Sequence, residues 1–277
     1  MVGPFQIGQV EIGGGRMFLI AGPCVIESEE HALKLAESIS GICRVLRLPY
    51  IFKASYDKAN RTSIQSYRGP GVAEGLRILR KIAARVKIPV LTDVHEAADV
   101  QRVAEAVDVL QIPAFLCRQT DLIVAAARSG RAVNIKKGQF VSPWDMRHAV
   151  EKARQAGNGR VFLTERGSSF GYNNLVVDMR SLPVMREFAP VVFDATHSVQ
   201  LPSVGSDGKE VSGGQPQFIP VLARAAVAAG VDGIFLEVHD NPVRAKSDGP
   251  NALELSKLRG VLEQLLAVRR AVTSLDS

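Results

Sequence analysis

Four basic side chains stand at or just beyond the ends of short apolar runs, where a parallel sheet would expose them. They are Lys53, Lys58, Lys136 and Arg166. Like charges repel at close range, so this group is stable only if an anion lies between its members. Arginine binds a carboxylate or phosphate through two parallel hydrogen bonds, and lysine acts as a point charge. The set predicts a site for a small molecule bearing a carboxylate and a phosphate, although each residue taken singly is as easily a surface side chain.

A second anion site is indicated by the segment Lys58-Ala59-Asn60-Arg61-Thr62-Ser63. A guanidinium, hydroxyl groups and backbone N–H groups in one loop are a common means of holding a phosphate. Taken alone, the segment is as compatible with a solvated turn as with a phosphate site.

A candidate metal site consists of Cys24, His197, Glu237 and Asp248, which lie at or just beyond the ends of the first, seventh and eighth predicted strands. One thiolate, one imidazole and two carboxylates suit Zn²⁺, Fe²⁺ or Mn²⁺ rather than Ca²⁺. The spacing matches no local metal-binding motif, and a buried cysteine is by default a small apolar residue. The other two cysteines, Cys43 and Cys117, are interpreted as structural.

The elements that position these residues alternate between β-rich runs and segments of helical period, which is typical of parallel βαβ units. Helical spacing is clear from Leu76 to Val86 and from Leu255 to Leu266. A glycine-rich start around residues 5–10 suggests a short hairpin that closes the bottom of the barrel. The eight predicted strands are 18–25, 50–55, 89–95, 109–115, 132–137, 160–166, 190–197 and 233–239.

Each of the eight predicted strands ends in polar or charged residues, and in a closed barrel all these ends open on one face. The 277 residues show no linker or composition break, so we expect a single (β/α)₈ TIM barrel over 1–277 with a short N-terminal β-hairpin. A doubly wound sheet is the competing fold. It is disfavoured because no Gly-x-Gly-x-x-Gly phosphate loop follows the first strand.

Composition and charge exclude several classes of protein. The 34 basic and 28 acidic residues give a net charge of +6, which also suits phosphorylated acidic substrates. No basic run or RNA-binding motif points to nucleic acid. No secretory signal, membrane-spanning stretch or disulfide framework is apparent, so we expect a cytoplasmic protein without a membrane partner.

Eight segments, in order along the chain, carry a resemblance to a known family: GPCVIES (22–28), FKASYDKANRTS (52–63), TDVHE (92–96), QIPAFLCRQTDL (111–122), NIKKGQF (134–140), ERGSSFGY (165–172), FDATHS (193–198) and SDGPNAL (247–253). Through them the sequence resembles the 3-deoxy-D-manno-octulosonate-8-phosphate synthases along nearly its whole length. The related 3-deoxy-arabino-heptulosonate-7-phosphate synthases typically have Lys-Pro-Arg-Thr-Ser where this chain has Lys58 to Ser63, so Asn60 favours the octulosonate family.

The resemblance implies condensation of phosphoenolpyruvate with D-arabinose 5-phosphate, a step of lipopolysaccharide biosynthesis. It implies an aldose site at Asn60 and Asp93 with the sugar phosphate on Arg61 and Thr62. It also implies a homotetramer in which Arg118 reaches a neighbour's phosphate site. The implied phosphoenolpyruvate ligands are Lys53, Lys58, Gln111, Lys136 and Arg166, and Ser55 and Phe115 complete the expected substrate-binding set.

The resemblance also bears on the metal. Metal-independent members of the family carry asparagine where this chain has Cys24, and metal-dependent members carry cysteine, so we expect a divalent transition metal, Zn, Fe or Mn. The stretch Leu201 to Gln217 departs from the family pattern, and we interpret it as a lid over the sugar.

The mechanism implied by the family joins C3 of phosphoenolpyruvate to the aldehyde carbon while water adds to C2. We expect catalytic roles for Asp93, His197, Lys136 and Glu237, with Asp93, Glu237 or a hydroxide supplied by the metal as base and His197 as proton relay. Two alternatives remain at this point. One is the sister heptulosonate-phosphate synthase, and the other is a non-catalytic barrel that senses phosphorylated sugars.

Overall fold

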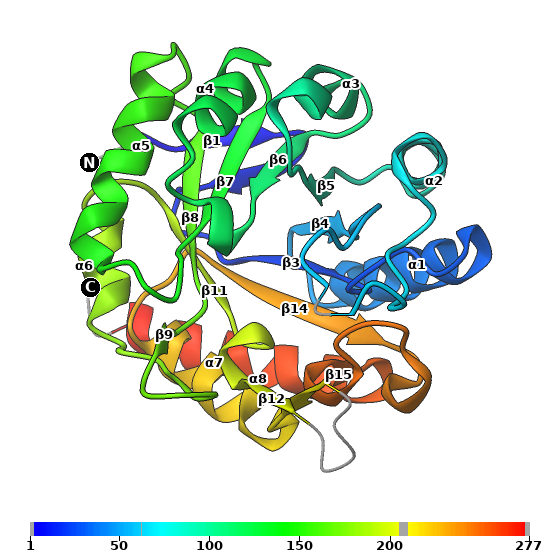
Figure 1. The fold of residues 1–277 in the computed structure, drawn as a ribbon. Helices are drawn as coiled ribbons and strands as arrows, with labels where there is room; N and C mark the ends of the chain where they lie inside the picture. The colour runs from blue at the N-terminus through cyan, green and yellow to red at the C-terminus, as the bar shows by residue number, and fades with distance from the viewer. Residues whose placement is uncertain (1–2, 62, 205–209, 275–277) are drawn as a thin grey trace.

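A computed structural model gives the structure of residues 3–61, 63–204 and 210–274. Eight parallel strands form a closed barrel surrounded by helices (Figure 1). Each strand pairs with the next along the chain, and β14 pairs with both β11 and β3 to complete the ring. The barrel strands are β3 Phe18–Gly22, β4 Tyr50–Lys53, β5 Val90–Asp93, β6 Val109–Ile112, β7 Ala132–Lys136, β8 Val161–Glu165, β11 Val191–Asp194 and β14 Gly233–His239. The predicted (β/α)₈ barrel is confirmed.

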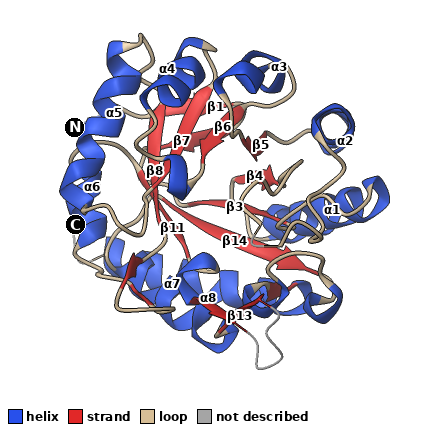
Figure 2. Cartoon of the chain, in the orientation of Figure 1, coloured by secondary structure: helices blue, strands red, loops and turns tan. Residues whose placement is uncertain are grey.

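The helices form an outer ring around the strands (Figure 2). They are α1 Glu29–Val45, α2 Val72–Val86, α3 Val100–Ala104, α4 Thr120–Arg128, α5 Met146–Gln155, α6 Ser181–Arg186, α7 Ile219–Ala228 and α8 Leu255–Thr273. The 3₁₀ turns are η1 Ala97–Asp99, η2 Ala114–Leu116, η3 Pro143–Asp145, η4 His197–Val199, η5 Pro216–Phe218, η6 Pro242–Arg244 and η7 Gly249–Asn251. Among the described residues no helix is both long and apolar enough to cross a bilayer.

The start of α1 shows why a helix begins where it does. Ser28 is extended and its hydroxyl accepts a hydrogen bond from the His31 backbone N–H at 3.1 Å. Glu29 and Glu30 then place negative charge against the positive end of the helix dipole. Ser142 also precedes a helical segment, but it makes no side-chain cap, and Pro143 opens the 3₁₀ turn η3 before α5 begins.

Seven of the eight barrel strands end earlier than the sequence patterns indicate, whereas β14 has the predicted bounds, 233–239. The first predicted strand runs to residue 25, whereas β3 ends at Gly22 and only an isolated bridge, Val25 to Ser55, continues the ladder. The last barrel strand, β14, runs to His239 and is extended by pairing with the short strand β15 (Leu253–Glu254). The residues beyond each strand leave the hydrogen-bond ladder and form the loops of the barrel mouth.

The predicted N-terminal hairpin is confirmed. Strands β1 (Phe5–Ile7) and β2 (Val10–Ile12) are antiparallel and are joined through Gly8, whose φ of 56° suits a tight turn. Ile7, Val10 and Ile12 pack in one cluster with the inward side chains at the amino ends of the barrel strands. The hairpin therefore closes the bottom of the barrel, opposite the mouth.

The loops of the mouth contain further short strands. Near the carboxyl end of β8, β9 (Ser168–Ser169) pairs with β10 (Leu175–Val176). After β11, β12 (Gln200–Val204) pairs with β13 (Glu210–Gly214), so part of the stretch interpreted as a lid is a β-ribbon. Its residues 205–209 lie outside the described part of the chain, and closure over a sugar stays a prediction.

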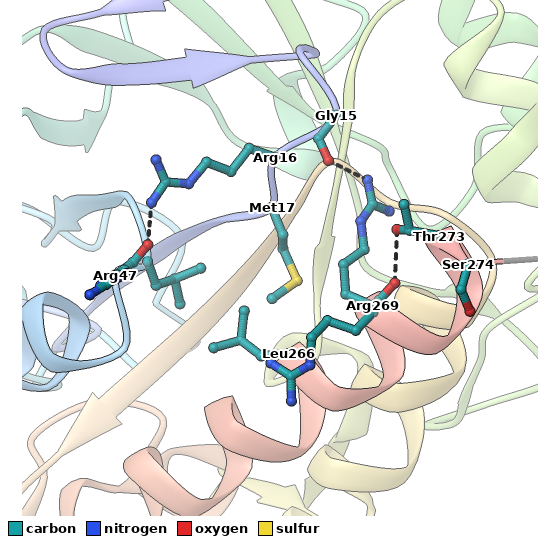
Figure 3. A pocket seen from close by; sticks show the side chains of 10 residues that line it. Gly15, Arg16, Met17, Arg47, Leu266, Arg269, Thr273 and Ser274 are labelled. Atoms are coloured by element: carbon teal, nitrogen blue, oxygen red, sulfur yellow. Dashed lines mark hydrogen bonds between the residues drawn. The ribbon is translucent and has the colours of Figure 1, made fainter. Parts of the chain in front are cut away.

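A hollow of about 470 Å³ lies at the amino end of the barrel, beside the carboxyl ends of α1 and α8 (Figure 3). Arg16 donates to the carbonyl oxygen of Arg47, and Arg269 Nη2 donates to that of Gly15 at 2.7 Å. Helix carboxyl ends carry partial negative charge, so arginines gathered here complement two helix dipoles. This hollow is remote from the mouth.

Candidate active site

A second hollow, of about 550 Å³, opens at the mouth of the barrel. Its walls come from the carboxyl ends of several strands and the loops that follow them, which is where enzymes of this architecture build their sites. Eleven of the residues predicted from the sequence line it: Lys53, Lys58, Asn60, Arg61, Asp93, Gln111, Phe115, Lys136, Arg166, His197 and Asp248. Residues from widely separated parts of the chain therefore face one cavity.

Two cations of the mouth have carboxylate partners within the protein. Lys53 is buried, and its Nζ lies 2.9 Å from Glu237 Oε1. Lys136 Nζ lies 2.6 Å from Asp194 Oδ2. Burial lowers the pKa of Lys136, and the nearby charges of Lys53 and Arg166 lower it further. An anion in the cavity would reverse this effect, so the cation set is suited to binding one.

The pKa of Lys58 shifts in the opposite direction to that of Lys136. Burial would lower its pKa, but acidic groups around it outweigh this and raise the pKa above its ordinary value. Those groups include Cys24, Glu237, Asp93 and Asp248. Lys58 therefore stays charged at neutral pH.

Arg166 has unused hydrogen-bonding capacity. It is 4% exposed, and burial lowers the pKa of its guanidinium. Its Nη2 donates to Gln200 Oε1 at 3.0 Å, whereas its buried Nη1 has no hydrogen-bond partner among the described residues. Because an unsatisfied buried donor is costly, Nη1 favours an anionic ligand beside it.

Asp93 is the centre of a small network on β5. It accepts a hydrogen bond from Ser55 Oγ, and its Oδ2 lies 2.9 Å from His95 Nε2. Burial would raise the pKa of Asp93, but the hydrogen bond and charge of His95, together with Lys58, hold it well below its usual range. The carboxylate is therefore a good hydrogen-bond acceptor and a weak base. Ser55 acts through Asp93 and does not line the cavity.

The amide of Gln111 is fixed by a chain of buried polar groups that crosses three strands. Gln111 Nε2 donates to Asn134 Oδ1 at 2.7 Å, and Asn134 Nδ2 donates to Thr164 Oγ1 at 2.8 Å. All three side chains are buried. The chain holds Gln111 in one orientation at the floor of the cavity.

The four predicted metal-binding residues converge beside the cations. Cys24 Sγ lies 3.0 Å from Asp248 Oδ2, which lies 3.4 Å from His197 Nε2. His197 Nε2 lies 3.9 Å from Glu237 Oε1, and the other oxygen, Oε2, is buried without a hydrogen-bond partner among the described residues. Asp248 is held in a left-handed conformation with φ of 53°.

These groups fit a divalent metal. Burial is the main cause that raises the pKa of the Cys24 thiol, and the carboxylates of Asp248 and Glu237 raise it further. A thiol so placed is a poor free nucleophile, but a metal ion would favour its thiolate. An orphaned carboxylate oxygen, an imidazole and a thiol within one small volume are the donors that zinc, iron or manganese binds.

Asp194 was not predicted as a site residue, yet it connects the two halves of the site. One of its oxygens, Oδ2, lies 2.6 Å from Lys136 Nζ and 2.7 Å from His197 Nδ1. It is fully buried, and the charges of these two neighbours hold its pKa well below the usual range although burial would raise it. Its position three residues before His197 at the end of a strand was a signal in the sequence.

The substrate contacts expected of Arg118 and Thr62, like the other site assignments, stay predictions. Arg118 is exposed and does not line the cavity, and its carbonyl oxygen accepts from Lys152 Nζ at 3.0 Å. Thr62 lies outside the described residues. Phe115 is at the rim of the cavity and is 57% exposed.

A separate group of potential metal ligands lies outside this cavity. The ligand atoms of Glu27, His31 and His239 all lie within 4.8 Å of one another. This group was not predicted from the sequence, because His31 lies in α1, away from the strand ends whose polar residues indicated the site.

Comparison with known proteins identifies the relatives of this chain. Residues 4–274 match the model of the DAHP synthetase I family. The chain is 70% identical over 273 residues to a 2-dehydro-3-deoxyphosphooctonate aldolase of Koribacter versatilis, covering 99% of this chain and 98% of the relative. Proteins of the same name from Trichlorobacter lovleyi and Desulfatibacillum aliphaticivorans are 60% and 56% identical, and the alignments cover 98% and 99% of this chain and 100% of each relative.

Proposed function

The chain belongs to the DAHP synthetase I family, and on this basis we propose that it condenses phosphoenolpyruvate with D-arabinose 5-phosphate and water to give 3-deoxy-D-manno-octulosonate 8-phosphate and phosphate. The relatives described above share 56–70% of its sequence over nearly full length and all carry the name 2-dehydro-3-deoxyphosphooctonate aldolase, which is another name for the synthase of this reaction. The observation that carries the proposal is that Lys136 and Arg166 line the same cavity as His197 and Asp248.

Phosphoenolpyruvate is assigned to the cationic side of the cavity. Lys53, Lys136 and Arg166 carry charges that match its carboxylate and phosphate, and Arg166 Nη1 is free to donate. Lys58 stays charged, and Gln111 is fixed by its buried amide chain. These groups orient the enol face and stabilise negative charge on the bound substrate.

The aldose is assigned to the side of the cavity lined by Asn60, Arg61 and Asp93. Asp93 has a strongly lowered pKa, so its role is to accept a hydrogen bond from a sugar hydroxyl rather than to remove a proton. C3 of phosphoenolpyruvate forms a bond to the aldehyde carbon, water adds to C2, and the bond from C2 to the phosphate oxygen breaks to release phosphate.

A divalent metal is assigned to Cys24, His197, Glu237 and Asp248. When bound, the metal would act as a Lewis acid toward an oxygen of a reactant. His197 Nδ1 lies 2.7 Å from Asp194 Oδ2, so a proton on Nδ1 leaves the Nε2 lone pair facing Glu237 and Asp248. This arrangement supports a ligand role for His197 over a proton relay.

Phosphate release from phosphoenolpyruvate tests the reaction and the metal together. We expect release with arabinose 5-phosphate, little with erythrose 4-phosphate, loss after treatment with EDTA, and recovery with Mn²⁺, Fe²⁺ or Zn²⁺. Cys24→Ala should abolish the recovery, whereas Cys117→Ala, at another buried cysteine, should keep it. Preference for erythrose 4-phosphate would contradict the substrate, and full activity in fully demetallated enzyme would contradict the metal.

A homotetramer in the cytoplasm is also part of the proposal. Large aromatic side chains are exposed around the mouth, including Phe115 at 57%, Phe140 at 63% and Phe170 at 70%, and contact between subunits would cover them. The three cysteines are free and buried, which suits a reducing compartment. Light scattering of the purified protein tests the tetramer, and a monomer at micromolar concentration would contradict it.

A further inference from the structure

Two histidines and a glutamate meet on the rim between β14 and α1, outside the cavity of the mouth. Glu27 lies in the loop after β3, His31 in the first turn of α1, and His239 at the last position of β14. One ligand atom from each lies within 4.8 Å of the other two. Their side chains are 15%, 16% and 8% exposed, so the group is mostly shielded from solvent but still within reach of an ion.

The distances suit a tetrahedral ion. His239 Nε2 and Glu27 Oε1 are 3.3 Å apart. Zinc binds nitrogen and oxygen at about 2.0–2.1 Å, so two neighbouring tetrahedral ligands stand roughly 3.4 Å apart. The rings of His31 and His239 have centroids 4.6 Å apart and are tilted by 44°, and a ring nitrogen of His31 lies within 4.8 Å of the ligand atoms of Glu27 and His239.

His31 supplies a nitrogen that the protein leaves unused. Its Nδ1 is buried and has no hydrogen-bond partner among the described residues, whereas its Nε2 lies 3.0 Å from Asp240 Oδ1. A metal-binding histidine commonly holds a carboxylate with its second nitrogen, which fixes the ring and raises its basicity. Asp240 Oδ1 also lies 3.3 Å from His239 Nδ1, so one carboxylate backs both rings.

A simple ion-pair network is the competing interpretation. Lys34 Nζ lies 2.8 Å from Asp240 Oδ2, and that lysine is 62% exposed. The network accounts for the position of Asp240. It does not account for the buried Nδ1 of His31 without a partner, or for the two imidazole rings packed against each other. A cation shared by both rings and Glu27 accounts for all three features.

We propose that Glu27, His31 and His239 form a second divalent transition-metal site, with two nitrogens and one oxygen as ligands and a fourth position open to water. Metal binding needs the Nε2 lone pair of His239, so the ring proton moves from Nε2 to Nδ1. Nδ1 then faces Asp240 Oδ1 at 3.3 Å and no longer accepts the hydrogen bond from the Asn241 N–H. The site contains no sulfur.

The second site would fasten a loop of the mouth. Glu27 Oε1 also accepts from the Lys246 backbone N–H at 2.8 Å, two residues before Asp248. An ion here therefore ties α1, the end of β14 and the loop of residues 240–248 together. Its effect on the reaction would be indirect, through the position of that loop.

Cobalt binding to the apoprotein separates this site from the one at Cys24. A thiolate ligand gives cobalt an intense charge-transfer band, which a site of nitrogen and oxygen ligands lacks. We expect wild type to bind two equivalents of Co²⁺ in equilibrium dialysis, and His31→Gln to bind one while keeping the band. Cys24→Ala should lose the band and keep one equivalent, which tests the proposed catalytic metal independently.

Two further variants complete the test. Glu27→Gln should also bind one equivalent of Co²⁺ fewer than wild type. If circular dichroism shows that His31→Gln is unfolded, Glu27→Gln takes its place as the test variant. His148→Gln removes an exposed histidine of α5 and should bind as wild type does. Zn²⁺ should raise Tm more in His148→Gln than in His31→Gln. Equal stoichiometry and equal shifts in folded His31→Gln, Glu27→Gln and His148→Gln would overturn the proposal.

Discussion

Asp194 shows how one residue can connect two kinds of chemistry. Its single oxygen Oδ2 contacts both Lys136, from the proposed anion-binding side, and His197, from the proposed metal-binding side. The sequence indicated Lys136 and His197 because lysine and histidine at strand ends are recognisable by type. Asp194 was visible as a polar residue at a strand end, but its role was not, because the role of a fully buried carboxylate depends on which neighbours the fold packs around it.

At Arg166 the shape of the side chain is expected to matter as much as its charge. Arg166→Lys keeps the charge but loses the two-pronged donor, so kcat/KM for phosphoenolpyruvate should fall by about 10- to 100-fold, or roughly 1.4–3 kcal/mol. Steady-state kinetics measures the change. Arg180→Lys, at an exposed arginine paired with Asp178, is the matched control and should leave the kinetics unchanged.

His95 should make stability depend on pH. Burial lowers its pKa, but the hydrogen bond and charge of Asp93 outweigh this and raise the pKa above its ordinary value. The stabilisation is therefore complete below about pH 6.5, the usual value in an unfolded chain, and is lost as pH rises through the folded-state pKa. Urea unfolding of wild type and His95→Gln from pH 6 to 9 measures it.

The free energy of unfolding of wild type should exceed that of His95→Gln by an amount that falls as pH rises. The fall is no more than about 1.4 kcal/mol per pH unit, since one proton is involved. Other titrating groups cancel in the difference between the two proteins. An advantage that grows with pH would contradict the assigned direction for His95.

Among the elements, β3 and β4 approach each other closely at the mouth. A Cβ on Gly22 would lie 2.0 Å from the carbonyl oxygen of Lys53, so Gly22→Ala must push the two strands apart. We expect a loss of about 1–3 kcal/mol of unfolding free energy and reduced activity, because Lys53 belongs to the site.

The control for Gly22→Ala lies in α1. A Cβ on Gly41 would meet no atom of a neighbouring element within 4 Å, and the residue sits inside a helix, so Gly41→Ala should stabilise the protein by about 0.5–1 kcal/mol. Denaturant titration of both variants checks the pair. Equal effects of the two substitutions would contradict the close approach at Gly22.

The sequence predicted the existence of the elements better than their ends. Apolar, β-branched runs and helical spacing are local signals, so all eight barrel strands were found. Strand ends depend on where the ladder to a neighbour stops, as at Gly22 and the isolated bridge from Val25 to Ser55. The ribbon of β12 and β13 was not predicted, because its glycines and Pro202 are more typical of a loop.

For the whole molecule, the barrel separates stability from chemistry. The hairpin residue Ile12 is 0% exposed at the bottom of the barrel, far from the mouth. Ile12→Ala should cost about 2–5 kcal/mol of unfolding free energy and leave kcat and KM unchanged at temperatures where the variant is folded. Val45→Ala, at a residue that is 68% exposed, should change stability by less than about 0.5 kcal/mol. A fall in kcat of folded Ile12→Ala would show that the bottom of the barrel and its mouth are energetically coupled.

Ring closure by β14 between β11 and β3 places Cys24 beside Asp248, although 224 positions separate them in the sequence. Cys24 is synthesised early in translation and Asp248 near its end. A nascent or prematurely terminated polypeptide would thus contain Cys24 and the lysines of the mouth but lack Asp248, one of the four residues of the proposed metal site. Catalytic competence should appear abruptly, once the final β/α unit has docked, and half-made enzyme would be inert.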